Sequence, residues 1–161
     1  MFEGRRVDRA KRGIYLSAAR SFVFNTLLAE RVNSGTWNTP MDGEVWMLQG
    51  SHSIFGPEPL TDALLARCLA LDIHPTGPMW GAGELRSQAA VLALESQLPV
   101  TLAALCQGLE AAGLKQERRA LRLLPQAMHW QFLDDNSLLL GFELPPGAYA
   151  TSVLAELGEF T

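Results

Sequence analysis

Apolar positions along the chain predict a helical first part and a strand-rich last part. Between residues 16 and 32 they recur every three or four residues, which predicts a helix, and the following Asn33-Ser34-Gly35 run ends it. After a polar loop, residues 45–48 predict a short strand, and residues 50–59 are expected to form either a loop or a second strand around Ile54 and Phe55.

Proline and glycine set the expectations for the middle of the chain. Thr61 and Asp62 are good first residues for a helix with apolar positions between 64 and 69. Residues 72–83 contain two prolines and three glycines, which predicts no regular structure. A helix should resume near Glu84 and end at Pro99, and Thr101 should cap another that runs to Gly113.

The pattern changes after Gly113. Residues 121–124, 129–133 and 138–144 predict strands, the last two joined by a turn, and residues 148–157 predict a final helix. The expected fold class is α/β, more closely α+β: a helix-rich body to about residue 120, then antiparallel strands and a terminal helix.

Charge is unevenly distributed in a chain of 161 residues whose formal net charge is −4. Residues 1–20 hold six basic and two acidic side chains, a net charge of +4, and residues 115–122 hold four and one, a net charge of +3. The remainder therefore carries −11. Two basic segments in an acidic protein indicate either phosphate-contacting surfaces or ordinary solvated ones, and charge alone does not decide between them.

Several other sites are disfavoured by spacing. His52, His74 and His129 have no close His or Cys neighbours, so we expect no metal site. Cys68 and Cys106 lie on apolar faces of predicted helices, which indicates buried, reduced thiols in a cytosolic protein. The chain has no apolar run long enough for a membrane span, and its first residues lack the apolar core of a signal peptide.

Phosphate-loop and catalytic-triad patterns are equally weak. The glycine-rich segment 77–83 lacks a following Lys-Ser or Lys-Thr and is better suited to a turn that places Trp80 under the next helix. His52 lies between two serines, but neighbours on a strand point to opposite faces. Asp134 and Asp135 lie in the predicted turn, where aspartate is favoured for turn chemistry alone.

Tyr149 is the most prominent candidate for a residue that contacts a ligand. It follows a strand and a Pro-Pro-Gly stop and precedes three small residues at the start of the last predicted helix. Such a tyrosine usually packs on the sheet, but an aromatic ring at this junction could also stack on an unpaired RNA base.

Several segments together resemble the TruD-type tRNA pseudouridine synthases. They are residues 11–25, 71–81 and 118–157, and the resemblance is densest in the Leu-Pro-Pro-Gly-Ala-Tyr-Ala-Thr-Ser run at 144–152. One departure is Ala155, where the family usually has arginine before Glu-Leu. The resemblance implies that residues 1–120 form the family's insertion domain, with 1–13 as a basic lead-in, and that residues 121–161 complete the catalytic domain.

The resemblance also implies a reaction. Family members isomerise a uridine at position 13, in the D arm of tRNA, to pseudouridine, without cofactor or metal. Tyr149 matches the family's aromatic residue that packs against the target nucleotide, and Asp134 and Asp135 do not match its catalytic aspartate. That aspartate and a second substrate-contacting run are expected before residue 1, so we expect this chain alone to be inactive.

The implied partners follow from these expectations. They are tRNA, and either the missing N-terminal half or a second copy of the chain; the expected location is the cytoplasm. The basic residues expected to contact RNA are Lys11, Arg12, Arg20, Arg118, Arg119 and Arg122, together with Arg5 and Arg6. The alternatives are a non-catalytic RNA-binding or interaction module derived from the family, and a small structural protein that retains only the scaffold.

Overall fold

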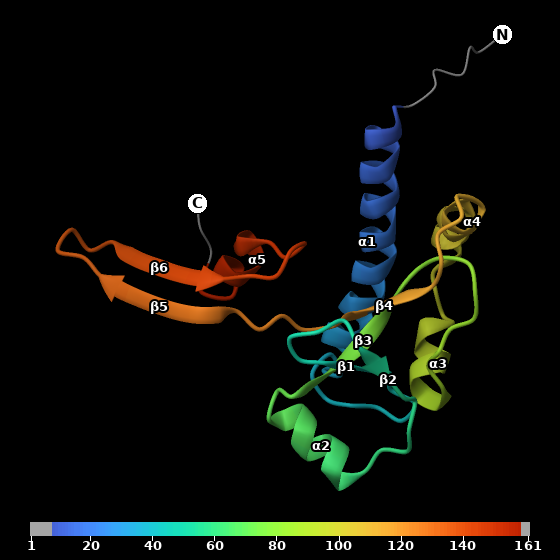
Figure 1. Cartoon of the computed structure of the whole chain (residues 1–161), viewed down its shortest axis with the longest axis horizontal. Coiled ribbons are helices and arrows are strands. Elements are labelled where there is room, and N and C mark those ends of the chain that lie inside the picture. Colours follow the sequence, from blue (N-terminus) through green and yellow to red (C-terminus); the bar gives the residue numbers. More distant parts are fainter. Residues whose placement is uncertain (1–7, 159–161) are drawn as a thin grey trace. The chain divides into compact units, whose positions relative to one another are not determined.

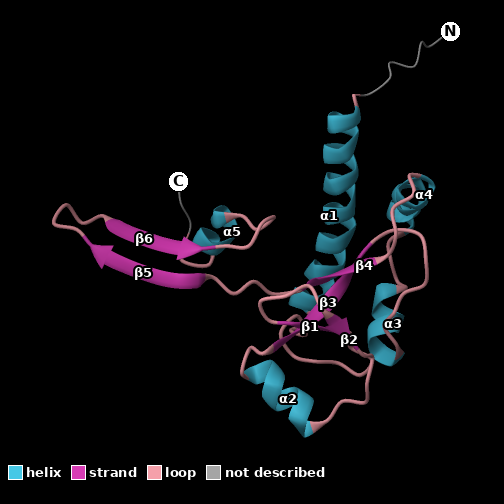
Figure 2. Cartoon of the chain, in the orientation of Figure 1, coloured by secondary structure: helices cyan, strands magenta, loops and turns pink. Residues whose placement is uncertain are grey.

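The structure, a computed structural model, describes residues 8–158 (Figure 1). The chain forms two compact units, Met1–Arg122 and Leu123–Thr161. The first unit combines helices with one sheet, and the second contains a two-stranded hairpin and a short helix (Figure 2). Helices and antiparallel sheets together make an α+β fold, as the sequence predicts. The assignment of either unit to a family domain stays a prediction.

Helix α1, Arg9–Asn33, is longer than expected. The start predicted near Leu16 is wrong, because the helix already includes most of residues 8–13, the described part of the basic lead-in. Arg, Lys and Ala are good helix formers without any apolar period, so a search for that period misses this end. The predicted stop is confirmed: Gly35 has φ 68°, and the Thr36 amide donates to the Arg31 carbonyl at 2.7 Å, the geometry of a Schellman cap.

The sheet of the first unit has the strand order β2-β1-β3-β4, and all neighbours are antiparallel. Strand β1 is Trp46–Leu48, as predicted, and β2 is Ile54–Phe55, where the sequence left a loop and a strand both open. Strand β4 is Glu117–Ala120, so the prediction of a strand at residues 121–124 is wrong: the strand ends before residue 121.

Strand β3, Ile73–Met79, overturns the expectation that residues 72–83 lack regular structure. All seven of its residues are buried. The strand pairs with β1 over Ile73–Pro75 and with β4 over Thr76–Met79. Each half of β3 is therefore paired with a neighbouring strand on one of its two sides. A sheet tolerates a proline at a position where no neighbouring strand needs a backbone N–H donor.

The helices beside the sheet are short. Helix α2, Asp62–Leu69, has the predicted cap: the Thr61 hydroxyl accepts a hydrogen bond from the Leu64 amide at 3.3 Å. Helix α3, Ala89–Glu95, begins later than the predicted Glu84. After Pro99 a 3-10 turn, η1, Val100–Leu102, leads into α4, Ala103–Ala111, so Thr101 lies inside that turn instead of capping a helix.

Three buried clusters stabilise the first unit. The first joins α1, η1 and α4 through Val23, Leu102, Cys106 and Leu109. The second joins β1, α2 and β3 through Trp46, Leu64, Cys68 and Ile73. The third joins α1, β3 and the residue after β4 through Phe24, Met79 and Leu121. Both cysteines are free and buried, as predicted. Burial raises the pKa of each thiol, which makes the reactive thiolate scarce.

The second unit consists of β5, Gln126–Phe132, β6, Leu138–Glu143, and α5, Ala150–Ala155. The predicted hairpin is confirmed, with a bulge near Ala127, whose φ is 49°. Helix α5 is shorter than the predicted 148–157. No single described helix is long and apolar enough to cross a membrane; the bent pair of α3 with Val100–Ala111 meets that test by length and composition only.

Candidate functional site

Tyr149 lies at the junction between the hairpin and α5. The Ala148 amide donates to the Pro145 carbonyl at 3.2 Å, and Gly147 has φ 86°, a conformation that glycine adopts without strain. This turn delivers Tyr149 to the N-cap position of α5 in an extended conformation, φ −118° and ψ 128°. Its side chain is 72% exposed. The ring is therefore presented to solvent and available for stacking in the second unit.

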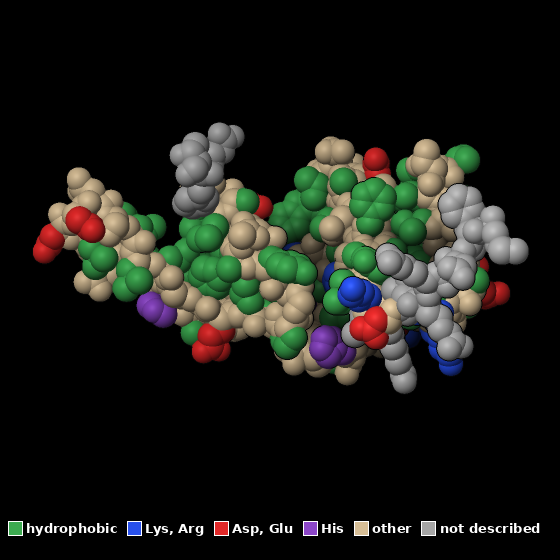
Figure 3. Space-filling model, turned by 90° about the horizontal axis from the view of Figure 1, so that it is seen from above, with side chains coloured by type: hydrophobic (Ala, Val, Ile, Leu, Met, Phe, Trp, Pro, Cys, Tyr) green, Lys and Arg blue, Asp and Glu red, His purple; other side chains and the backbone are tan. Residues whose placement is uncertain are grey.

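One face of the β5–β6 hairpin is apolar and largely exposed. Trp130 is opposite Leu140, and Phe132 is opposite Leu138, on the same face, because side chains alternate along a strand. Trp130 is 64% exposed and Phe132 76%, and none of the described residues of this unit is buried. Figure 3 shows hydrophobic side chains on the surface of this unit. The rest of the described unit therefore covers β5 and β6 poorly.

Arg118, one of the expected RNA contacts, is bonded inside the first unit. Its guanidinium donates to both carboxylate oxygens of Glu95, at 2.9 and 2.7 Å, and to the hydroxyl and carbonyl of Thr76. The two side chains of this ion pair are only 4% and 3% exposed. The same carboxylate accepts a hydrogen bond from the Ser87 hydroxyl at 2.5 Å. This pair joins α3 to β4 and leaves Arg118 no surface for a phosphate.

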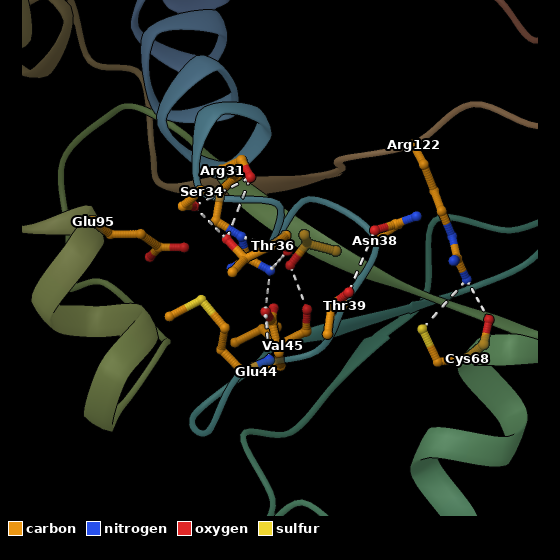
Figure 4. A network of polar contacts seen from close by, with 12 residues as sticks. Arg31, Ser34, Thr36, Asn38, Thr39, Glu44, Val45, Cys68, Glu95 and Arg122 are labelled. Atoms are coloured by element: carbon orange, nitrogen blue, oxygen red, sulfur yellow. Dashed lines mark hydrogen bonds and ion pairs between the residues drawn. The ribbon is translucent and has the colours of Figure 1, made fainter.

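Arg20 and Arg122 also have internal partners. Arg20 donates to the carbonyls of Met79 and Lys115 and pairs with Glu117 at 3.1 Å. Arg122 donates to carbonyl oxygens of the first unit and to a ring nitrogen of His74 (Figure 4 shows its contacts with Cys68). Neither guanidinium is free for RNA in this arrangement.

Three of the expected basic residues are exposed. Lys11 and Arg12 lie on the first turns of α1, and Arg119 lies on β4 with its guanidinium 5.3 Å from the centre of the Phe24 ring. Arg5 and Arg6 lie outside the described residues. Charge counting therefore identified a basic segment at 115–122 but did not separate surface cations from buried ones.

Comparison with known proteins identifies the family. A family model described as "tRNA pseudouridine synthase D (TruD)" matches residues 5–157. The chain belongs to the TruD family. It is 56% identical over 158 residues to tRNA pseudouridine synthase D of Xanthomonas campestris pv. campestris (strain B100), covering 96% of this chain and 43% of that protein. It is 48% identical over 158 residues to tRNA pseudouridine synthase D of Aeromonas hydrophila subsp. hydrophila, covering 98% of this chain and 45% of that protein.

A solved structure supports the same fold. The crystal structure of a putative TruD from Methanosarcina mazei superposes with a TM-score of 0.61 at 22% identity, over 85% of this chain and 36% of that chain. The chain thus spans less than half of the length of these TruD relatives.

Acidic residues in the hairpin turn have a structural explanation. Asp135 accepts hydrogen bonds from the amide and hydroxyl of Ser137, at 2.9 and 2.5 Å, and these bonds lower the pKa of its carboxyl. A general acid or base near neutral pH needs the opposite shift. The turn role predicted for Asp135 is confirmed. Among residues 8–158, no group of three or more His, Cys, Asp or Glu side chains could hold a metal ion.

A buried ionic pair that sequence reasoning missed lies near the end of α1 (Figure 4). Arg31 donates to Glu44 at 2.5 Å and to the Thr36 carbonyl at 2.6 Å, and both charged residues are buried. Burial raises the pKa of Glu44, and the Arg31 guanidinium offsets part of that shift. The second oxygen of Glu44 has no hydrogen-bond partner among residues 8–158. Glu44 directly precedes a buried apolar run, the one sequence signal that could have revealed it.

Proposed function

We propose that this chain forms part of a tRNA pseudouridine synthase, the activity named in the TruD relatives. The observation that carries the proposal is the family match over residues 5–157, which includes Tyr149 and the turn that exposes it. The proposed reaction converts a uridine in the D arm, at position 13, to pseudouridine. It is an isomerisation: the bond from C1′ to the base nitrogen breaks, the base turns, and a bond from C1′ to a ring carbon forms.

Tyr149 is proposed to pack its ring against the target nucleotide. A uridine must leave the RNA stack before its base can turn, and an aromatic face replaces part of the stacking lost. Stacking of this kind is worth about 1–3 kcal/mol per base by alanine substitution. The exposed ring and the short, tight turn before it support this role.

The nucleophilic carboxylate is proposed to come from outside this chain. Asp135 is held in its turn by Ser137, and Asp72 pairs with Arg67 at 2.6 Å. Both carboxylates thus have local partners, and none of the chain's aspartates matches the sequence context of the family's catalytic aspartate. The chain by itself is therefore proposed to be inactive.

Phosphate contacts are proposed for the first unit and the residues before it. All 13 lysines and arginines lie at or before residue 122, so the unit that carries Tyr149 has no cation. Lys11, Arg12 and Arg119 are the described candidates; Arg5 and Arg6 are carried forward from the sequence. In this proposal the first unit contacts the phosphates of the RNA, and the second unit contacts the target base through Tyr149.

The apolar face of the hairpin, defined by Trp130, Phe132, Leu138 and Leu140, is proposed to be covered in the active enzyme. Its occupant would be the segment of the TruD relatives that has no counterpart here, or failing that a second copy of this chain. Large exposed aromatic side chains on one sheet face are typical of an interface. The proposed location of the enzyme is the cytoplasm, where tRNA is modified.

Reconstitution tests the proposal. The chain is assayed for pseudouridine in a tRNA transcript, alone and after mixing with the segment of a TruD relative that has no counterpart in this chain. We expect no product from either piece alone and product from the mixture. Product from this chain alone would place the nucleophile within it. RNA binding without product in the mixture would favour the alternative, a non-catalytic RNA-binding module.

A further inference from the structure

His74 is a buried histidine with a partner at each ring nitrogen. It lies on β3 and is 4% exposed. Its Nε2 is 2.5 Å from the side-chain oxygen of Gln49, which follows β1, and its Nδ1 is 2.7 Å from Nε of Arg122, which follows β4. The imidazole thus lies between two segments that leave the sheet.

The chemistry of these partners fixes the protonation state of the ring. A guanidinium has only N–H donors, so Nδ1 of His74 must accept and carries no proton. Nε2 must then carry the single proton and donate it to Gln49. The only position where His74 can take up a second proton is the nitrogen that holds Arg122.

Arg122 connects three elements where the first unit ends. Its Nη2 donates to the carbonyl of Cys68 at 2.6 Å, in the last turn of α2, and to the carbonyl of Ile73 at 2.8 Å, at the start of β3. A guanidinium at a helix C-terminus satisfies a carbonyl that the helix itself leaves unpaired. Arg122 is also the last residue of this unit.

We propose that His74 and Arg122 form a proton-operated latch: a proton on Nδ1 of His74 displaces the guanidinium and releases the end of β4 together with the C-terminus of α2. Proton and guanidinium compete for one lone pair, so the latch is closed when the imidazole is neutral and open when it is charged. Opening lengthens the free chain that precedes Leu123.

The charged groups around His74 set the direction of the response. The charged groups that act on the ring are Arg122, at Nδ1, and Asp72, which directly precedes β3 and pairs with Arg67 of α2. The Cys68 thiol of α2 contacts Arg122. Gln49, which follows β1, is uncharged. Burial lowers the pKa of His74, and Arg122 lowers it further, while Asp72 raises it in part.

The sign for stability follows from these shifts. With its pKa lowered in the folded state, His74 binds fewer protons when folded than when unfolded. The latch therefore contributes fully above the ordinary imidazole value of 6.5, and its contribution is lost as the pH falls below it.

Hydrogen exchange on the full chain tests the latch. The reporters are the amide of Leu121, which donates to the Pro75 carbonyl, and that of Leu71, which donates to the Cys68 carbonyl; amides within α4 are the reference. After correction for intrinsic rates, we expect protection of both reporters to fall about tenfold between pH 7.5 and 5.5, with the reference unchanged. Equal loss at reporters and reference would overturn the proposal.

Two further measurements separate the latch from general acid sensitivity. In His74→Asn the amide oxygen replaces Nδ1 as acceptor and cannot titrate, so protection of the reporters should be insensitive to pH; a fall equal to that of the unaltered chain would contradict the latch. Nitrogen chemical shifts of the unaltered chain need no variant. They should show Nδ1 of His74 without a proton at pH 7.5, and a protonated Nδ1 at that pH would overturn the proposal.

Discussion

Replacing Glu95 with Gln removes one charge from the buried pair that joins α3 to β4. The guanidinium of Arg118 would keep its charge in a site where the side chain is 4% exposed, and one of its donors would face the new amide N–H₂. Breaking a buried pair by removing one partner costs about 3–5 kcal/mol, because the remaining charge stays desolvated and uncompensated. The same carboxylate also serves Ser87, so a second hydrogen bond is weakened.

Asp72→Asn is the matched control. It removes one charge from the pair with Arg67, whose side chains are 43% and 54% exposed. Water solvates such charges when they are separated, so the expected loss is below about 1 kcal/mol. Both variants remove one negative charge and change the net charge of the chain equally.

Urea unfolding provides the assay. Trp46 is fully buried in the first unit, and a Trp130→Phe background removes the tryptophan of the hairpin from the signal. With a slope of about 2 kcal/mol per M, Glu95→Gln should lower the midpoint by about 2 M, and Asp72→Asn by less than about 0.5 M. Glu95→Met with Arg118→Met should recover most of the loss. Equal shifts for the two single variants would refute the reasoning.

Three further predictions concern charge, pH and the hairpin. Lys11→Gln with Arg12→Gln should reduce the steepness of the salt dependence of tRNA binding by roughly 1.4–1.8, since each phosphate contact contributes about 0.7–0.9 to that slope; an unchanged slope would exclude both as phosphate contacts. Glu44→Gln should cost less stability at pH 7 than Glu95→Gln, because one Glu44 oxygen has no partner. The pKa of Glu44 is raised in the folded state, so the unaltered chain should gain stability relative to Glu44→Gln as the pH falls through that pKa. A free energy of unfolding, from urea titrations, that falls relative to that of Glu44→Gln over this range would contradict this. Finally, the chain should self-associate at micromolar concentration through its exposed hairpin face, and Phe132→Lys should reduce that association; sedimentation of the unaltered chain as a stable monomer would contradict it.

Local signals predicted the elements whose pattern is carried by neighbours in sequence. The Schellman cap at Gly35, the Thr61 cap and the β5–β6 hairpin all depend on contacts within a few residues, and all are present. Strand β3 was missed because its prolines argue against a strand, and only its pairing with a different neighbour in each half makes them acceptable.

The buried ion pairs were missed for a related reason. Glu95 ends an apolar helix, and its partner Arg118 lies 23 residues further along the chain, so no local pattern connects them. Tyr149, by contrast, could be found from sequence, because the Pro-Pro-Gly turn before it is a local signal for a strand end. Its exposure agrees with the expected role, while the role itself depends on the family.

We propose that Tyr149 supplies the aromatic face for the target uridine. Pseudouridine formation by the chain combined with the segment of a TruD relative that it lacks, with Tyr149 varied, tests this role most directly. Tyr149→Phe keeps the ring and should be mild, whereas Tyr149→Ala should lower the single-turnover rate roughly ten- to a hundredfold, the equivalent of about 1–3 kcal/mol. Tyr15→Ala, which removes the chain's other exposed tyrosine, is the control and should leave the rate unchanged. A Tyr149→Ala enzyme that retains the full rate would contradict the account.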